Sequence, residues 1–188
     1  MDPISALVDK TEELLGHSPH PAIVALPLGA WTVSNLCDGL ALATGDDSFD
    51  DAAQISMGIG LLGAAGAIVT GIRDYSKIPQ DRPSHDVATA HGLGNALVSS
   101  LFVASYIMRA RASARNEPPG TLARVLALAG GGLSAYTGWL GGKLVSEYGE
   151  GVKPVMDQLS RAEDQEDSDH STGRDRLQAG TPLGSLTV

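Results

Sequence analysis

The sequence is poor in cysteine and in positive charge, and each shortage excludes a class of protein. Its one cysteine, Cys37, excludes an intrachain disulfide and argues against a thiolate metal cluster. Lys and Arg number 13 against 22 Asp and Glu, which gives a formal net charge of −9. Because a phosphate backbone demands clustered Lys and Arg, we expect no nucleic-acid partner.

Recognisable catalytic motifs are also missing. The sequence holds no HExxH, phosphate loop or CxxC, and Ser134 lacks the second glycine of a GxSxG nucleophile elbow. The segment "GIGLLG" matches the dinucleotide fingerprint at Gly58, Gly60 and Gly63, but that fingerprint needs a preceding strand. Since it lies inside an uncharged apolar run, we interpret it as a chance match. No catalytic residue is assigned, and whether the chain is an enzyme stays open.

Four long stretches are almost free of charge, at residues 22–44, 52–72, 92–108 and 122–146. A helix that rises about 1.5 Å per residue crosses a bilayer's hydrocarbon core in about 20 apolar residues, which these runs match. A soluble helix would carry a charged stripe, and "AAQISMGIGLLGAAGAIVTGI" has none. The sequence therefore predicts an all-α, integral membrane four-helix bundle in the cell membrane, in contact with the lipid bilayer.

Three segments follow from this pattern. Residues 1–16 place apolar side chains on one helical face and charged ones on the other, which predicts an amphipathic helix at the membrane surface. Residues 17–153 form the predicted four-span domain. Residues 154–188 are polar and acidic with little to bury, so we expect a disordered tail. Because no basic n-region precedes the first run, we interpret it as a span and not as a secretory signal.

Four spans would bring the N-terminus, the second loop and the C-terminus to one side of the membrane, here called the near side. Four of the five histidines fall on that side, and none falls on the other. The residues expected to converge there are His17, His20, Arg73, Asp74, His85, His91, Glu147 and Tyr148.

Polar stripes on the runs predict a site at this near side. Hydrocarbon cannot satisfy polar groups, so the stripes that contain His20 and His91 should face the bundle interior. Histidines on facing helices of a bundle can hold haem. We therefore name His20 and His91 as candidate ligands of haem b or of a divalent metal, with Asp74 and Asn95 in supporting positions. A purely structural hydrogen-bonding role, proton handling and ligand contact stay open as alternatives.

Asp38 belongs to the opposite, far side, because it lies about 27 Å from His20 along a helix. Its natural partners there are Gln54, Arg109 and Arg124. We interpret Asp38 as one member of a buried structural pair and not as an ion site.

The end of the fourth run carries three further residues to which we assign structural roles. Lys143 and Glu147 are an i, i+4 pair, which predicts a snorkelling pair near the interface, and Tyr148 follows them. Near-side Lys and Arg close to the runs outnumber far-side ones by six to four, which favours cytoplasmic termini. They are Lys10, Arg73, Lys77, Arg82, Lys143 and Lys153 against Arg109, Arg111, Arg115 and Arg124.

Four short motifs resemble, in order and spacing, a bacterial family of membrane proteins catalogued as domain of unknown function 2231. They are "GHSPHPAIVALPLG", "GIRDY", "HGLGN" and "GWLGGKLVSEYGEGV", and the resemblance covers residues 14–153. It implies a small multi-pass bacterial membrane protein with no assigned catalytic activity, joined in some relatives to an iron–sulfur Rieske domain. The motif positions fall on His17, His20, Asp38, Asp74, His91, Asn95, Gly141, Gly142 and Tyr148.

This chain departs from the family pattern at two positions. Relatives tend to have Tyr where Ser146 stands and often have His where Tyr148 stands. If that His is a ligand in relatives, a phenol replaces it here, which puts the transfer of a metal or haem site in doubt. The cysteine and histidine pairs of a Rieske centre are not in the sequence.

Two functions follow from the sequence. In the first, the chain is a structural or accessory membrane subunit, whose partners are other membrane subunits or a Rieske-type redox protein. In the second, it is a haem- or metal-binding redox module that uses His20 and His91. A transporter is a weaker third interpretation, because few ionisable residues, Asp38 and Lys143 among them, lie inside the apolar stretches.

Overall fold

A computed structural model describes residues 3–152, 155, 157–158, 161–162 and 165. Within that part of the chain there are five α-helices and no β-strand. The helices are α1 (Pro3–Leu15), α2 (His20–Thr44), α3 (Ser48–Tyr75), α4 (Pro83–Ser113) and α5 (Thr121–Ser146). The predicted all-helical class is confirmed. The predicted disordered tail, residues 154–188, lies almost entirely outside the described residues.

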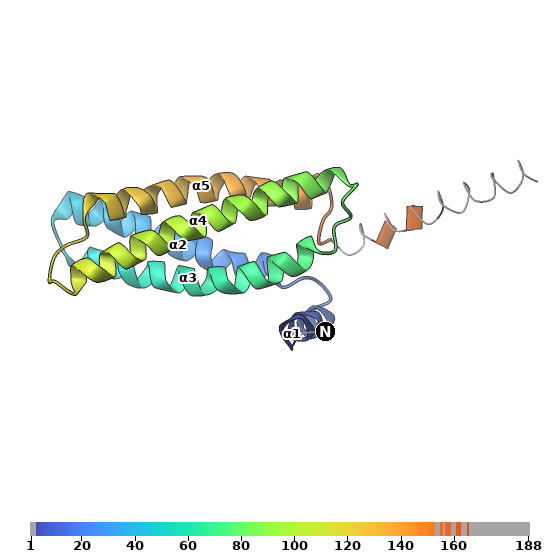
Figure 1. Cartoon of the computed structure of the whole chain (residues 1–188), viewed down its shortest axis with the longest axis horizontal. Helices are drawn as coiled ribbons and strands as arrows, with labels where there is room; N and C mark the ends of the chain where they lie inside the picture. Colours follow the sequence, from blue (N-terminus) through green and yellow to red (C-terminus); the bar gives the residue numbers. More distant parts are fainter. Residues whose placement is uncertain (1–2, 153–154, 156, 159–160, 163–164, 166–188) are drawn as a thin grey trace, which may run out of the picture.

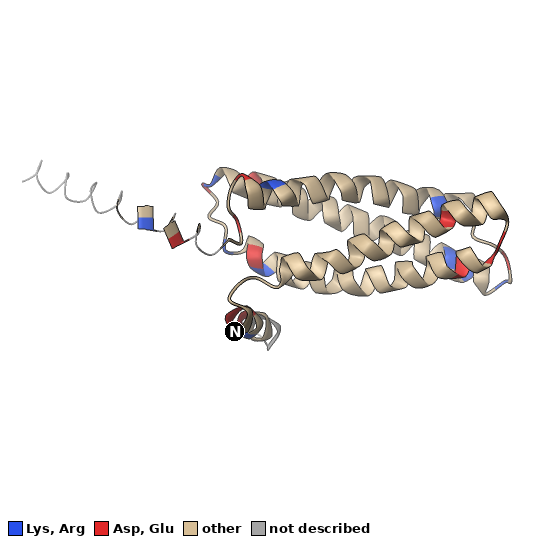
Figure 2. Ribbon diagram, turned by 180° about the vertical axis from the view of Figure 1, so that it is seen from behind, with Lys and Arg blue, Asp and Glu red and all other residues tan. Residues whose placement is uncertain are grey.

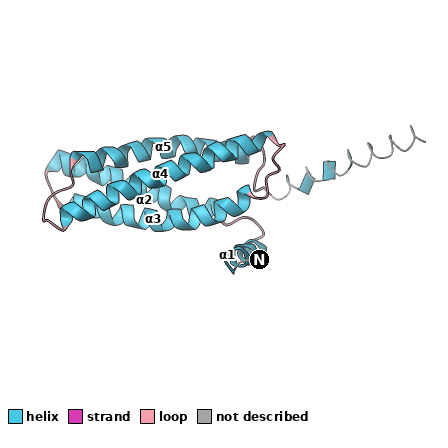
Figure 3. Ribbon diagram, viewed as in Figure 1, coloured by secondary structure: helices cyan, strands magenta, loops and turns pink. Residues whose placement is uncertain are grey.

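Helices α2 to α5 run side by side along the long axis of the molecule and alternate in direction (Figures 1 and 3). The α2–α3 and α4–α5 connections lie at one end of this bundle, here called the far end. The α3–α4 connection, α1 and the end of α5 lie at the other, the near end. The segments expected to share the near side are therefore brought together.

Local backbone chemistry sets the helix boundaries. Gly45 ends α2 in the left-handed conformation, with φ of 71°, and its N–H donates to the carbonyl of Ala41 at 2.9 Å. The carboxylate of Asp46 then accepts the N–H of Ser48 at 2.9 Å and opens α3. Hydrogen bonds from Ser48 lower the pKa of this exposed carboxyl. Pro83 starts α4, because a proline at the first helical position loses no intrahelical hydrogen bond.

The bundle is apolar on its outside as well as in its core. Large side chains such as Leu42, Leu62 and Leu128 are mostly exposed, and similar side chains cover all four long helices. Charged residues gather at the two ends and leave a long uncharged middle (Figure 2). Exposing so large an apolar surface to water would be unfavourable, whereas contact with hydrocarbon is not. The apolar helices are therefore suited to contact a lipid bilayer.

Three of the long helices, α2, α3 and α4, are long and apolar enough to cross a membrane. The predicted fourth span, residues 122–146, forms α5, which is long enough but is not among these candidates. Its glycines, together with Ser, Thr, Tyr and Trp, lower its mean hydropathy. By length and composition, the structure therefore supports three membrane spans.

Helix α1 lies across the bundle and not along it, since it is seen almost end-on where the long helices are seen lengthwise (Figures 1 and 3). Val8 is buried, whereas Leu7, Leu14 and Leu15 are exposed. Two ion pairs fasten its charged face to the end of α3, from Arg73 to Asp9 at 2.8 Å and from Lys77 to Glu12 at 2.5 Å. The helix predicted within residues 1–16 is therefore present as α1, and its place at a membrane surface stays a prediction.

Candidate functional site

The far end holds a buried network of two acids and two bases. Arg109 is fully buried, and its Nη2 donates to Asp38 Oδ2 at 2.5 Å. Arg124 lies between two carboxylates, 3.7 Å from Asp38 and 2.9 Å from Asp50. The four formal charges cancel, which makes burial tolerable because each charge faces an opposite one. The network joins all four long helices.

The expected partners of Asp38 are partly right. Arg109 and Arg124 contact it as predicted, but the structure gives no such contact to Gln54 and places Asp50 there instead. Asp50 lies in the first turn of α3, where an acidic residue commonly stabilises the helix N-terminus from an exposed position. Its place in the sequence therefore gave no indication that it is buried.

Ser105 extends this network toward the middle of the bundle. Arg109 Nε donates to Ser105 Oγ at 3.2 Å, and Ser105 donates to the carbonyl of Ala123 at 2.7 Å. The side chains of Arg109 and Asp38 are therefore held by neighbours and aligned with each other. Side chains held in this way are better suited to a structural ion pair than to a site that must bind and release an ion.

At the near end, His20 is held by α3. Its Nδ1 lies 3.0 Å from Thr70 Oγ1, and the Thr70 hydroxyl itself donates to the carbonyls of Gly66 and Ala67. This hydrogen bond joins the start of α2 to α3. The imidazole lies directly over Gly71, where a Cβ atom would come within 2.9 Å of His20 Cε1.

His91 is held in the same manner by α5. Its Nδ1–H donates to the carbonyl of Thr137 at 2.8 Å, and Asn95 Nδ2 lies 3.2 Å from its Nε2. Its ring lies over Gly141, where a Cβ atom would come within 2.9 Å of His91 Cε1. Asn95 binds the His91 carbonyl through Nδ2 at 2.9 Å and accepts the Thr137 hydroxyl at 3.0 Å.

Asp74 joins the cluster through Ser18. The Ser18 hydroxyl donates to Asp74 at 2.5 Å and also accepts the backbone N–H of His20 at 3.1 Å. His20 lies within electrostatic range of both Asp74 and His91. The structure therefore brings His20, His91, Asp74 and Asn95 to one end of the bundle.

Three partners in this cluster were not named from the sequence: Ser18, Thr70 and Thr137. Thr70 and Thr137 lie within apolar helices, where such a residue carries no distinctive signal because it can bond to the carbonyl one turn earlier. Ser18 lies in the turn before α2. Each became a partner only when another helix packed against it.

The remaining candidates also lie at the near end of the bundle. Lys143 contacts Glu147 at 3.3 Å, as the i, i+4 spacing predicts, and its ammonium lies 5.6 Å from the ring centre of Trp139. Tyr148 is half-buried. His17 is exposed, and its Nδ1 bonds to the carbonyl of Ser18 at 2.9 Å.

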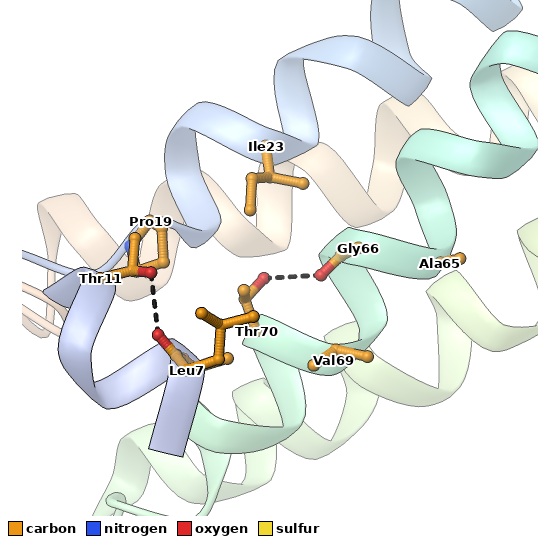
Figure 4. Close-up of a pocket in the computed structure, with 9 residues that line it drawn as sticks. Leu7, Thr11, Pro19, Ile23, Ala65, Gly66, Val69 and Thr70 are labelled. Atoms are coloured by element: carbon orange, nitrogen blue, oxygen red, sulfur yellow. Dashed lines mark hydrogen bonds between the residues drawn. The ribbon is translucent and has the colours of Figure 1, made fainter. Parts of the chain in front are cut away.

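A pocket with an apolar lining lies beside this cluster, and Thr70 borders both. It has a volume of about 390 Å³ and opens between α1 and the outer faces of α2 and α3 (Figure 4). Among the described residues, no group of three or more His, Cys, Asp and Glu side chains is arranged to hold a metal ion. The structure therefore gives no support to a conventional metal site. The pocket is lined by Leu7, Val8, Thr11, Pro19, Ile23, Ala65, Gly66, Val69 and Thr70.

The three glycines that match a dinucleotide fingerprint lie in the middle of α3, within an uninterrupted helix. Gly58 faces Tyr106, Gly60 faces Trp31 and Gly63 faces Pro27. They allow neighbouring helices to approach α3 closely, which agrees with the chance-match interpretation.

Comparison with known proteins identifies one family. Residues 16–154 match the family model described as predicted membrane protein (DUF2231), which covers α2 to α5. No curated protein and no solved structure matches the chain. The resemblance noted from the sequence motifs over residues 14–153 is confirmed.

Proposed function

Since the chain belongs to the DUF2231 family of predicted membrane proteins, we propose that it is a four-span structural or accessory membrane subunit. The observation that carries this proposal is that the interior polar side chains bind one another across helices, whereas the outer surface is apolar. In hydrocarbon, such internal bonds hold helices together, because no water competes for them. The partners proposed from the sequence, other membrane subunits or a Rieske-type redox protein, belong to this proposal.

Counting α5 as the fourth span rests on its packing. It lies alongside α4 over its length and supplies buried residues from Ala123 to Leu140. Both of its charged side chains are near its ends, where Arg124 is paired inside the bundle and Lys143 reaches toward the near end. A helix held in the bundle in this way crosses the bilayer together with its neighbours.

Labelling of single cysteines in intact membrane vesicles tests this topology. In a Cys37→Ser background, we expect Gln80→Cys and Glu147→Cys to react with an impermeant maleimide from one side, and Asp46→Cys and Glu117→Cys from the other. Cytoplasmic termini further require Gln80 and Glu147 to label only from the cytoplasmic side. If Glu147→Cys instead labels together with Glu117→Cys, α5 does not span.

The structural role of the two half-buried histidines gives a second expected result. His20→Ala and His91→Ala should each lower the free energy of unfolding in mild detergent by about 0.5–1.5 kcal/mol, because each removes a hydrogen bond that joins two helices. Thermal unfolding followed by size-exclusion chromatography measures the loss. His17→Ala is the matched control and should unfold like the wild type, since its imidazole is exposed.

A haem- or metal-binding redox module is the second candidate function. The observation that favours it is that the two imidazoles come from different helices and lie within electrostatic range of each other at the near end. Bound haem would supply electron transfer, and His20 and His91 are the residues that would hold it. A Soret band in protein from haem-supplied cells, lost in His20→Ala and His91→Ala but kept in His17→Ala, would favour it over the structural role. Protein without that band and without metal by elemental analysis would exclude it.

A further inference from the structure

The buried positions of α2 recur in α4 with a constant offset. Each buried residue of α2 lies 71 positions before a buried residue of α4. The pairs are Pro27 and Val98, Trp31 and Phe102, Ser34 and Ser105, Asp38 and Arg109, and Ala41 and Ala112. The same offset carries His20, the first residue of α2, onto His91.

Helices α3 and α5 correspond in the same way, with an offset of 70. Five buried residues of α3 have a buried counterpart in α5. The pairs are Ala53 and Ala123, Met57 and Ala127, Gly60 and Gly130, Ala64 and Ser134, and Thr70 and Leu140. A shared 3.6-residue period would produce some coincidences, but it does not require the same register in two separate pairs of helices.

The contacts made at equivalent positions also correspond. Gly60 is the glycine against which Trp31 packs, and its counterpart Gly130 is the one against which Phe102 packs. Likewise, His20 lies over Gly71 and His91 lies over Gly141, which is the counterpart of Gly71. His91 bonds to the backbone of Thr137, and His20 has a backbone interaction at Ala67, the equivalent residue of α3.

We infer that residues 20–75 and 91–146 are two copies of one helical hairpin, and that the inner face of each copy is an interaction surface that fits the other copy. The arrangement is a twofold one, with its axis along the bundle. Parallel repeats related by an axis along the membrane normal are a known way to build membrane domains.

Twofold packing explains which residues meet across the bundle. In such an interface, equivalent residues near the axis face each other. Trp31 and Phe102 stack with ring centres 4.2 Å apart and an angle of 11° between their planes. Asp38 and Arg109, a further equivalent pair, form the buried ion pair. Both pairs join α2 to α4, which are not neighbours in the chain.

The charged pair also explains why the first hairpin pairs with the second hairpin and not with another copy of itself. Two copies of the first hairpin would place Asp38 against Asp38 in the interior, and two copies of the second would place Arg109 against Arg109. Like charges buried together are strongly unfavourable, so the opposite charges select the mixed pair. His20 and His91, with Gly71 and Gly141, are by contrast the same in both copies.

Distances between spin labels test the twofold arrangement in the full-length protein. In a Cys37→Ser background, Leu36→Cys and Gly132→Cys form one labelled pair, and Ile107→Cys and Leu62→Cys form the equivalent pair. All four positions are exposed, so the labels need not disturb the core. Twofold packing makes the two measured distances equal. A difference larger than one helical turn, about 5.4 Å, would overturn the inference.

An exchange of the stacked aromatic residues provides a second test. If Trp31 and Phe102 occupy equivalent sites, the double variant Trp31→Phe with Phe102→Trp should keep the unfolding temperature of the wild type in detergent. Trp31→Ala and Phe102→Ala should each lower it clearly. A double variant that unfolds as early as Trp31→Ala would show that the two sites are not equivalent and would overturn the inference as well.

Discussion

Arg109→Ala is expected to lower the free energy of unfolding by about 3–5 kcal/mol, the largest loss for a single substitution in this protein. The substitution leaves the carboxylate of Asp38 buried at 9% side-chain exposure without its closest partner. It also removes the donor to Ser105, which Arg109 binds at 3.2 Å. Denaturation of the purified protein in detergent, followed by circular dichroism, measures the effect.

Arg111→Ala is the matched control for this prediction. Arg111 stands two residues later on α4 and is exposed, so its removal should change the free energy of unfolding by no more than about 0.5 kcal/mol. Asp38→Asn combined with Arg109→Met should recover much of the loss, because it leaves no unpaired charge inside the bundle. An Arg109→Ala protein as stable as the Arg111→Ala protein would show that the far-end network does not stabilise the fold.

Gly60→Ala is expected to have a large effect for so small a substitution, a loss of about 1–3 kcal/mol through overpacking. A Cβ atom at this position would lie 2.4 Å from the indole ring of Trp31. The indole cannot move aside easily, because it is buried and stacked on Phe102. The measurement is the same denaturation in detergent.

Gly132→Ala provides the comparison for Gly60→Ala. Nothing lies within 4 Å of a Cβ atom at Gly132. Alanine there should be neutral or should stabilise the helix by about 0.5–1 kcal/mol, since glycine is the poorer helix former. In a Trp31→Ala background, Gly60→Ala should change the free energy of unfolding little, because the indole ring with which the new Cβ atom would clash is absent. If Gly60→Ala costs the same in both backgrounds, contact with Trp31 is not the cause.

Much of the far end and near end could be predicted from spacing alone. Because helices have a fixed rise, the position of a residue within a run gives its depth, and depth placed Asp38 with Arg109 and His20 with His91. Depth says nothing about which neighbouring helix a side chain meets. His20 therefore turned out to bind Thr70 on α3, and His91 to bind Thr137 on α5.

The burial of Asp50 and the fit of Trp31 over Gly60 were not predictable from the sequence. Both depend on the rotation of one helix against another, which is set by the sum of many small contacts and not by any local pattern. The repeat is not evident from the sequence for a related reason. Its two copies agree in which positions are buried, whereas opposite charges and different aromatic rings occupy several of those positions.

By itself, the sequence determined the helical class, the long apolar helices, the N-terminal helix α1, the family and the separation of polar residues to two ends. These properties depend on composition, on helical period and on short ordered motifs, all of which are local. Only the tertiary structure decided the partners of each buried polar group and the equivalence of the two hairpins. Those depend on how four helices are rotated and paired, which close packing between distant segments selects.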